Sequence, residues 1–258
     1  MVGDSAVTVR PNGQQVCAIG GAAKVHYASA ANVGFSLWGN AIVGGQQIDE
    51  WMDTFIGSHV TKDTSLEEVG ELLAERLGSD LCLDRKPWEQ LRCGIHLAGY
   101  YQGLPRLWHV HCGHLEEPAH EPRLYRDYPE GRGWSDEYFR VFMFSEGGTA
   151  SCHLRNGYTP HYALLHKHAV DYANSLQQHL GLTFPRDSLL GHLEFHKVLV
   201  RFVAGVLVAA GEHPGVNDQL SALAFDQDGL KHDELLPITP WRKHAEGLAP
   251  SYLAFSWR

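Results

Sequence analysis

The chain has 258 residues, 44% of them hydrophobic and 20% charged, which is enough apolar content for one large domain or two small ones. Its 21 Lys and Arg residues face 30 Asp and Glu residues, and this net charge of -9 argues against nucleic acid as a partner. The first residues lack the basic and long apolar regions of a signal peptide, and Arg201 interrupts the most apolar later run. We therefore expect a cytoplasmic protein with no membrane partner.

The cysteines point to the same compartment. They are odd in number and scattered, and no two of them form a C-x-x-C pair: Cys17, Cys82, Cys93, Cys112 and Cys152. This pattern favours reduced thiols over a disulfide framework or a zinc knuckle.

The first forty residues predict antiparallel strands. Two β-prone runs, Ala6–Arg10 and Gln14–Ile19, are joined by Pro-Asn-Gly, which is a strong hairpin signal. A strand then covers Lys24–Tyr27, and the apolar run Val33–Trp38 predicts a buried strand that ends at Gly39.

Two amphipathic helices follow these strands. Apolar residues recur at helical spacing from Ile48 to Ile56, and the pattern repeats from Leu66 to Leu77 after polar residues at 63–65 that can cap a helix. We expect both helices to cover one face of the sheet.

The second half of the chain continues with strands, then helices, then a last strand. The expected strands are Arg92–Ala98, Arg106–Cys112, Tyr138–Ser145 and Gln219–Phe225, the expected helices are 162–180 and Leu193–Ala210, and 116–133 is expected to be a loop.

This order favours an α+β fold, a four-layer αββα sandwich of two antiparallel sheets, because a parallel sheet would alternate strands and helices one for one. We expect one domain over 1–230 and a packed tail over 231–258. The expected core includes Trp38, Trp51, Phe55, Phe202 and Val206.

Several motifs occur in an order that resembles a known family. They are DSAVT at Asp4–Thr8, the lysine at Lys24, the strand-to-glycine run FSLWGNA, the two amphipathic helices, the hairpin around GYYQGLP and the acidic turn after the last strand. In this order the chain resembles the proteasome-like amino-terminal-nucleophile (Ntn) hydrolases of the 20S proteasome β-subunit and HslV type. The resemblance implies that the first strand and the nucleophile of that family are missing from these 258 residues.

The resemblance implies a catalytic set of Asp4, Lys24 and Gly39. In that family a lysine lowers the pKa of the attacking group, an aspartate orients the lysine, and a backbone N–H stabilises the oxyanion. We expect Lys24 within about 4 Å of Asp4, with its ammonium facing a groove.

Two functions are compatible with these motifs. The first is hydrolysis of a peptide or amide substrate by a Thr, Ser or Cys upstream of Met1, in which case the 258 residues alone are inactive. The second is a non-catalytic subunit that assembles with itself or with related subunits.

A histidine-rich run gives a separate hypothesis. His109 and His111 alternate along a strand and so share a face, with Cys112 and His114 nearby, which is compatible with a metal site. No further ligand at firm spacing completes the set, so we expect neither a metal nor a cofactor. No nucleophile elbow or phosphate-binding glycine loop occurs either.

Overall fold

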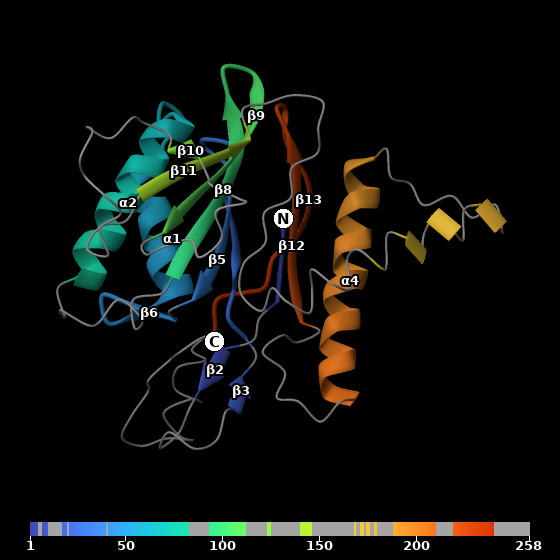
Figure 1. Cartoon of the computed structure of the whole chain (residues 1–258). Helices are drawn as coiled ribbons and strands as arrows, with labels where there is room; N and C mark the ends of the chain where they lie inside the picture. The colour runs from blue at the N-terminus through green and yellow to red at the C-terminus, as the bar shows by residue number, and fades with distance from the viewer. Residues whose placement is uncertain are drawn as a thin grey trace.

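The structure is a computed structural model of the chain. It describes residues 1–4, 7–9, 17–19, 21–39, 41–82, 93–111, 123–124, 140–145, 168, 171–172, 174–175, 178–179, 188–209 and 219–239. Within these ranges the fold is a mixture of α and β structure with antiparallel sheets, as the sequence predicts (Figure 1).

The largest sheet has six strands in the order β10-β11-β9-β8-β5-β4. Their bounds are β4 Val25–Ala28, β5 Val33–Gly39, β8 Cys93–Tyr101, β9 Leu104–His111, β10 Arg123–Leu124 and β11 Arg140–Ser145. Every pair of neighbours in this sheet is antiparallel. The central hairpin β8–β9 turns at Gln102 and Gly103, both with positive φ.

A second sheet has the order β1-β12-β13 and brings the two ends of the described chain together. Its strands are β1 Val2–Asp4, β12 Leu220–Asp226 and β13 Gly229–Glu234. Two short antiparallel pairs complete the strands, β2 Val7–Val9 with β3 Cys17–Ile19, and β6 Ile42–Val43 with β7 Gln46–Gln47.

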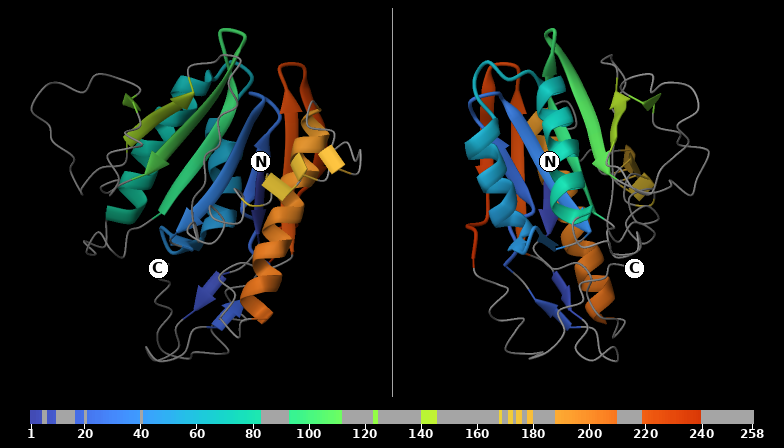
Figure 2. Two further views of the ribbon diagram at one scale, coloured as in Figure 1. Left: turned by 45° about the vertical axis from the view of Figure 1, so that its right-hand side comes forward. Right: turned by 90° about the vertical axis from the view of Figure 1, so that its left-hand side faces the viewer.

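Among the described residues, three helices lie against these sheets. α1 (Ile48–His59) and α2 (Leu66–Cys82) cover one face of the six-stranded sheet, whereas α4 (Leu189–Ala209) packs on β12 and β1 (Figures 1 and 2). α2 begins with a capping box, because the Ser65 hydroxyl accepts from the Glu68 N–H at 3.2 Å and a Glu68 carboxylate oxygen accepts from the Ser65 N–H at 2.8 Å.

The main core lies between the six-stranded sheet and α1 and α2. Alternate residues of β5 and β8, among them Phe35, Leu37, Ile95 and Leu97, meet the apolar stripes of both helices there. Of the expected core residues, Trp51 and Phe55 belong to this cluster.

The opposite face of the six-stranded sheet packs against the three-stranded sheet. At Gly34 of β5, a side chain would meet Phe225, Leu223 and the Met1 sulfur within 2.9 Å, so the missing side chain lets the two sheets approach closely. This close packing brings β1 next to the residues that precede β4.

The structure differs from the sequence-based predictions in several places. Phe202 is 55% exposed and Val206 39%, because α4 is apolar on two faces and buries Leu199 and Val203 instead. β10 lies inside the expected loop, and β13 extends past residue 230 into the expected tail. The expected helix over 162–180 lies largely outside the described residues, and the division into domain and tail stays a prediction.

No helix among the described residues is both long enough and apolar enough to cross a lipid bilayer. The cytoplasmic location expected from the sequence stays a prediction.

Two valines of α4 test which of its faces is buried. Val203 is 1% exposed and Val198 is 58% exposed. We expect Val203→Ala to lower the free energy of unfolding by about 2 kcal/mol, through lost burial and a cavity. Val198→Ala should change it by less than about 0.5 kcal/mol. Urea unfolding monitored by circular dichroism measures both, and equal losses would contradict this placement of α4.

Candidate functional site

The candidate site lies where β1 ends and β4 begins. The Lys24 ammonium donates to a carboxylate oxygen of Asp4 at 3.0 Å, and their side chains are only 10% and 17% exposed. The expected contact between these two residues is therefore present, and it joins strands of different sheets. An ion pair that is this far removed from water is screened less by salt than a surface pair.

Gly3, the residue before Asp4, lets β1 lie close to the start of β4. A side chain at Gly3 would come within 3.0 Å of Val25 and 3.3 Å of the Lys24 Cβ. β1 can therefore lie directly against the start of β4, and the next residue on β1, Asp4, comes within reach of the ammonium.

The backbone on both sides of Lys24 is also fixed by hydrogen bonds. The Lys24 carbonyl accepts from the Leu37 N–H at 2.8 Å. On the other side, the Ala23 N–H donates to Asp49 at 3.1 Å, and the Ala23 carbonyl accepts from His26 at 2.8 Å.

Gly39, the third expected residue, ends β5 on the strand adjacent to Lys24. It lies two residues beyond Leu37 and has a φ of 89°, a conformation that favours glycine. The three expected residues thus lie at the ends of β1, β4 and β5, although their catalytic roles stay predictions.

His109, the first histidine of the run, lies on the face of the sheet opposite α1 and α2. The Trp38 indole N–H donates to Nε2 of His109 at 2.9 Å, and the rings of His96 and His109 lie 4.7 Å apart, edge to face. His109 is 1% exposed. The sequence did not predict that Trp38 and His96 meet His109, while Cys112 and His114 lie outside the described residues.

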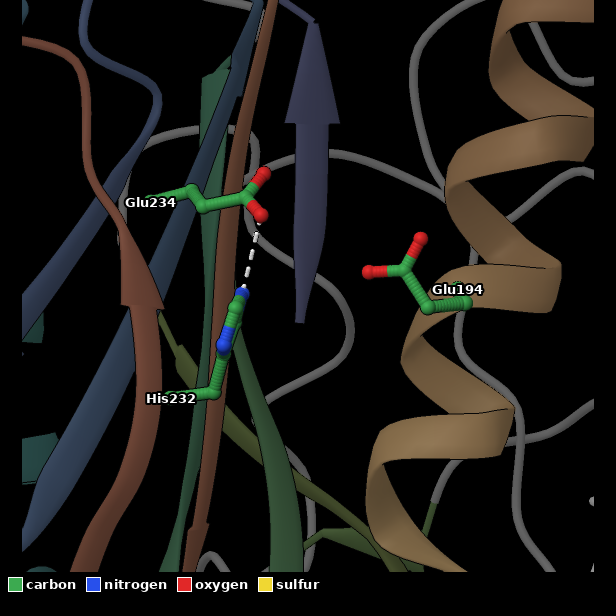
Figure 3. Close-up of side chains that lie close together, drawn as sticks. All are labelled: Glu194, His232 and Glu234. Carbon is green, nitrogen blue, oxygen red and sulfur yellow. Dashed lines mark hydrogen bonds and ion pairs between the residues drawn. The ribbon is translucent and has the colours of Figure 1, made fainter.

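A second polar cluster joins α4 to β13. Figure 3 shows Glu194 pointing from α4 toward His232 and Glu234 of β13, and their ligand atoms lie within 4.8 Å of one another, close enough to hold a metal ion. The Lys197 ammonium, however, lies 2.8 Å from the Glu194 carboxylate and 2.7 Å from that of Glu234. These carboxylates are therefore already paired with a cation that the chain supplies.

Burial and partners shift the pKa values of this cluster and of His26. The hydrogen bond from Lys197 lowers the pKa of Glu234. Burial would lower the pKa of Lys197, but its hydrogen bonds with Glu194 and Glu234 raise it above the ordinary value. Burial lowers the pKa of His26, although the Ala23 carbonyl and the charge of Asp53 act in the opposite direction.

Sequence reasoning missed the residues that support Lys24. Asp49 is fully buried in the first turn of α1, and His26 is 7% exposed. The sequence did show an aspartate at the start of an amphipathic helix. An aspartate in that position is usually interpreted as a capping residue or as a residue exposed to solvent.

Comparisons with known proteins give distant structural likeness only. No protein-family model matches the chain, and no curated protein does. Among solved structures it is similar to Anbu (ancestral beta-subunit) from Yersinia bercovieri, with a TM-score of 0.47, 12% identity, and coverage of 96% of this chain and 87% of that one. It is also similar to Anbu from Hyphomicrobium sp. strain MC1, with a TM-score of 0.41, 8% identity and the same coverage.

These comparisons correct the family identification made from the sequence. The identification as a 20S β-subunit or HslV-type chain without its first strand and nucleophile is wrong, because the neighbours found are Anbu chains and no family model matches. The motifs that suggested it are short and lie far apart in the chain, so they describe local structure better than ancestry.

The Asp4–Lys24 pair can be tested against an exposed ion pair of the same type. We expect Lys24→Met to lower the free energy of unfolding by about 1–3 kcal/mol, since it leaves a largely buried carboxylate without its ammonium. The control is Lys231→Met, because the Lys231–Asp226 pair has side chains 41% and 39% exposed. This control should cost less than about 1 kcal/mol. Equal losses in chemical unfolding would show that Lys24 is not specially placed.

The α4–β13 cluster predicts a dependence of stability on pH. Because the pKa of Glu234 is lowered in the folded state, its contribution is fully present above 4.5, the ordinary value, and is lost as pH falls through the folded pKa. The raised pKa of Lys197 keeps that group charged throughout this range. We expect the stability difference between wild type and Glu234→Gln to shrink below pH 4.5. Thermal unfolding at several pH values measures it, with Glu75→Gln on the exposed face of α2 as control. A difference that stays constant down to strongly acidic pH would contradict the pairing.

Proposed function

We propose that the cluster of Asp4, Lys24 and Gly39 belongs to a site that hydrolyses amide bonds. The observation that carries this proposal is the 3.0 Å ion pair between Lys24 and Asp4, largely shielded from water and joining the two sheets. A shielded ammonium with a fixed partner is a group that can lower the pKa of a neighbouring hydroxyl, thiol or amine by its charge.

Each residue has a separate role in this proposal. Lys24 favours the deprotonated form of an attacking group placed beside it, and Asp4 holds the ammonium in position. The N–H of Gly39 donates to the oxygen that becomes negative when the amide carbonyl is attacked. The attacking group is a Thr, Ser or Cys other than these three residues.

The proposed substrate is a peptide or a related amide, and the proposed location is the cytoplasm. We also propose that the layers described above form a four-layer αββα sandwich. The packing of α1 and α2 on one sheet, of that sheet on β1 and β12, and of α4 on the far side supports it.

A non-catalytic subunit that assembles with copies of itself is the second candidate. It is favoured by the outward face of α4, where Val198, Phe202 and Val206 follow one another at intervals of one turn and are 58%, 55% and 39% exposed.

A hydrolysis assay separates the two candidates. We expect the protein to cleave at least one peptide of a fluorogenic panel. Lys24→Ala should reduce the rate by several orders of magnitude, because the attacking group then keeps its ordinary pKa. Lys62→Ala, at an exposed position after α1, is the matched control.

Two results would count against hydrolysis. One is a protein that cleaves no peptide of the panel. The other is cleavage at a rate that Lys24→Ala leaves unchanged. If light scattering then shows an oligomer, the second candidate holds.

A further inference from the structure

We propose that Asp49 is the positioning residue of Lys24, acting through the peptide of Ala23. In this arrangement the Asp49 carboxylate accepts from the Ala23 N–H. It fixes the backbone from which the lysine side chain extends, and this inference rests on the proposed function of Lys24.

The first observation is where the Asp49 carboxylate lies. Asp49 is 0% exposed and occupies the first turn of α1. One of its oxygens accepts from the Ala23 N–H at 3.1 Å, and the other accepts from the Glu50 N–H at 3.0 Å. A carboxylate at the N-terminus of a helix is stabilised by the helix dipole and the free N–H groups there.

The second observation is that the Ala23 peptide is held from both sides. Its N–H donates to Asp49, and its carbonyl accepts from the His26 ring at 2.8 Å. Ala23 itself is 1% exposed, and the next residue is Lys24. Neither Asp49 nor His26 is required by the strand ladder, so these contacts fix this peptide in addition to the pairing of β4 with β5.

The bond between Asp49 and Ala23 affects the position of the Lys24 ammonium. Lys24 precedes β4, and its carbonyl accepts from the Leu37 N–H of β5. Without the Asp49 bond, the Ala23 peptide would lose its link to α1 and keep the bond from the His26 ring. The lysine side chain would then sample other directions, and the 3.0 Å contact with Asp4 would be populated for a smaller part of the time.

The experiment measures how accessible each lysine is. Reductive methylation of the folded protein with ¹³C-formaldehyde, followed by peptide mass spectrometry, gives a modification rate for Lys24. Lys197 serves as an internal reference, because it is 4% exposed and lies in a separate cluster on α4. The methylation rate can be measured whether or not the protein hydrolyses a substrate. A negative result here would therefore reject the role of Asp49 without rejecting the proposed function.

We expect Asp49→Ala to raise the Lys24 rate several-fold and to leave the Lys197 rate unchanged. Asp49→Asn should keep Lys24 near the wild-type rate, because an amide oxygen can still accept from the Ala23 N–H. Glu50→Gln, an exposed neighbour in the same turn, should change neither rate.

Three outcomes would overturn the proposal. They are an unchanged Lys24 rate in Asp49→Ala, equal increases in Asp49→Ala and Asp49→Asn, and a joint increase at Lys24 and Lys197, which would mean general unfolding. If Asp49→Ala does not fold, His26→Phe removes the other contact to Ala23. It should raise the Lys24 rate alone, and an unchanged rate would reject the proposal.

Discussion

The ion pair between Lys24 and Asp4 is the constraint on which the candidate site depends. It spans the two sheets, since Asp4 ends β1 and Lys24 precedes β4. Gly3 leaves room for β1 beside β4, and the two sheets meet closely at Gly34. The position of the two charges therefore depends on how the sheets pack. A change that moves the sheets apart would also move the Lys24 ammonium away from the Asp4 carboxylate.

The surroundings of Lys24 show how a buried ammonium is kept in one position. The Asp4 carboxylate compensates the charge, while the peptides on each side of the lysine are bonded to β5, to the start of α1 and to His26. Lys197 is buried in a different way, between two carboxylates on the far side of the second sheet. The chemical role that we propose for Lys24 rests on its place between the two sheets.

Local sequence patterns predicted the elements better than they predicted the packing. The apolar run at 33–38 and the stripes of α1 and α2 gave strands and helices at nearly the observed bounds, because each buries one face. This reasoning failed for α4. Phe202 and Val203 are adjacent and both apolar, so the pattern does not predict which of them faces the sheet. β1 is three residues long and depends on β12, more than 200 residues away, so no local signal could reveal it. Asp4, Lys24 and Gly39 were predicted as a site from their order in the chain, and their catalytic roles stay a prediction, whereas the contact of Asp49 with Ala23 could not be predicted because it depends on α1 lying beside Ala23.

The central claim is that the Lys24 ammonium is held against Asp4 in solution. The most direct measurement is NMR of the lysine side-chain NH₃⁺ groups, which detects slow hydrogen exchange and scalar coupling across a hydrogen bond to a carboxylate. The account predicts a slowly exchanging Lys24 signal that couples to the Asp4 carboxyl carbon and is lost in Asp4→Asn. A Lys24 signal that exchanges as fast as that of the exposed Lys62, with no coupling, would contradict it.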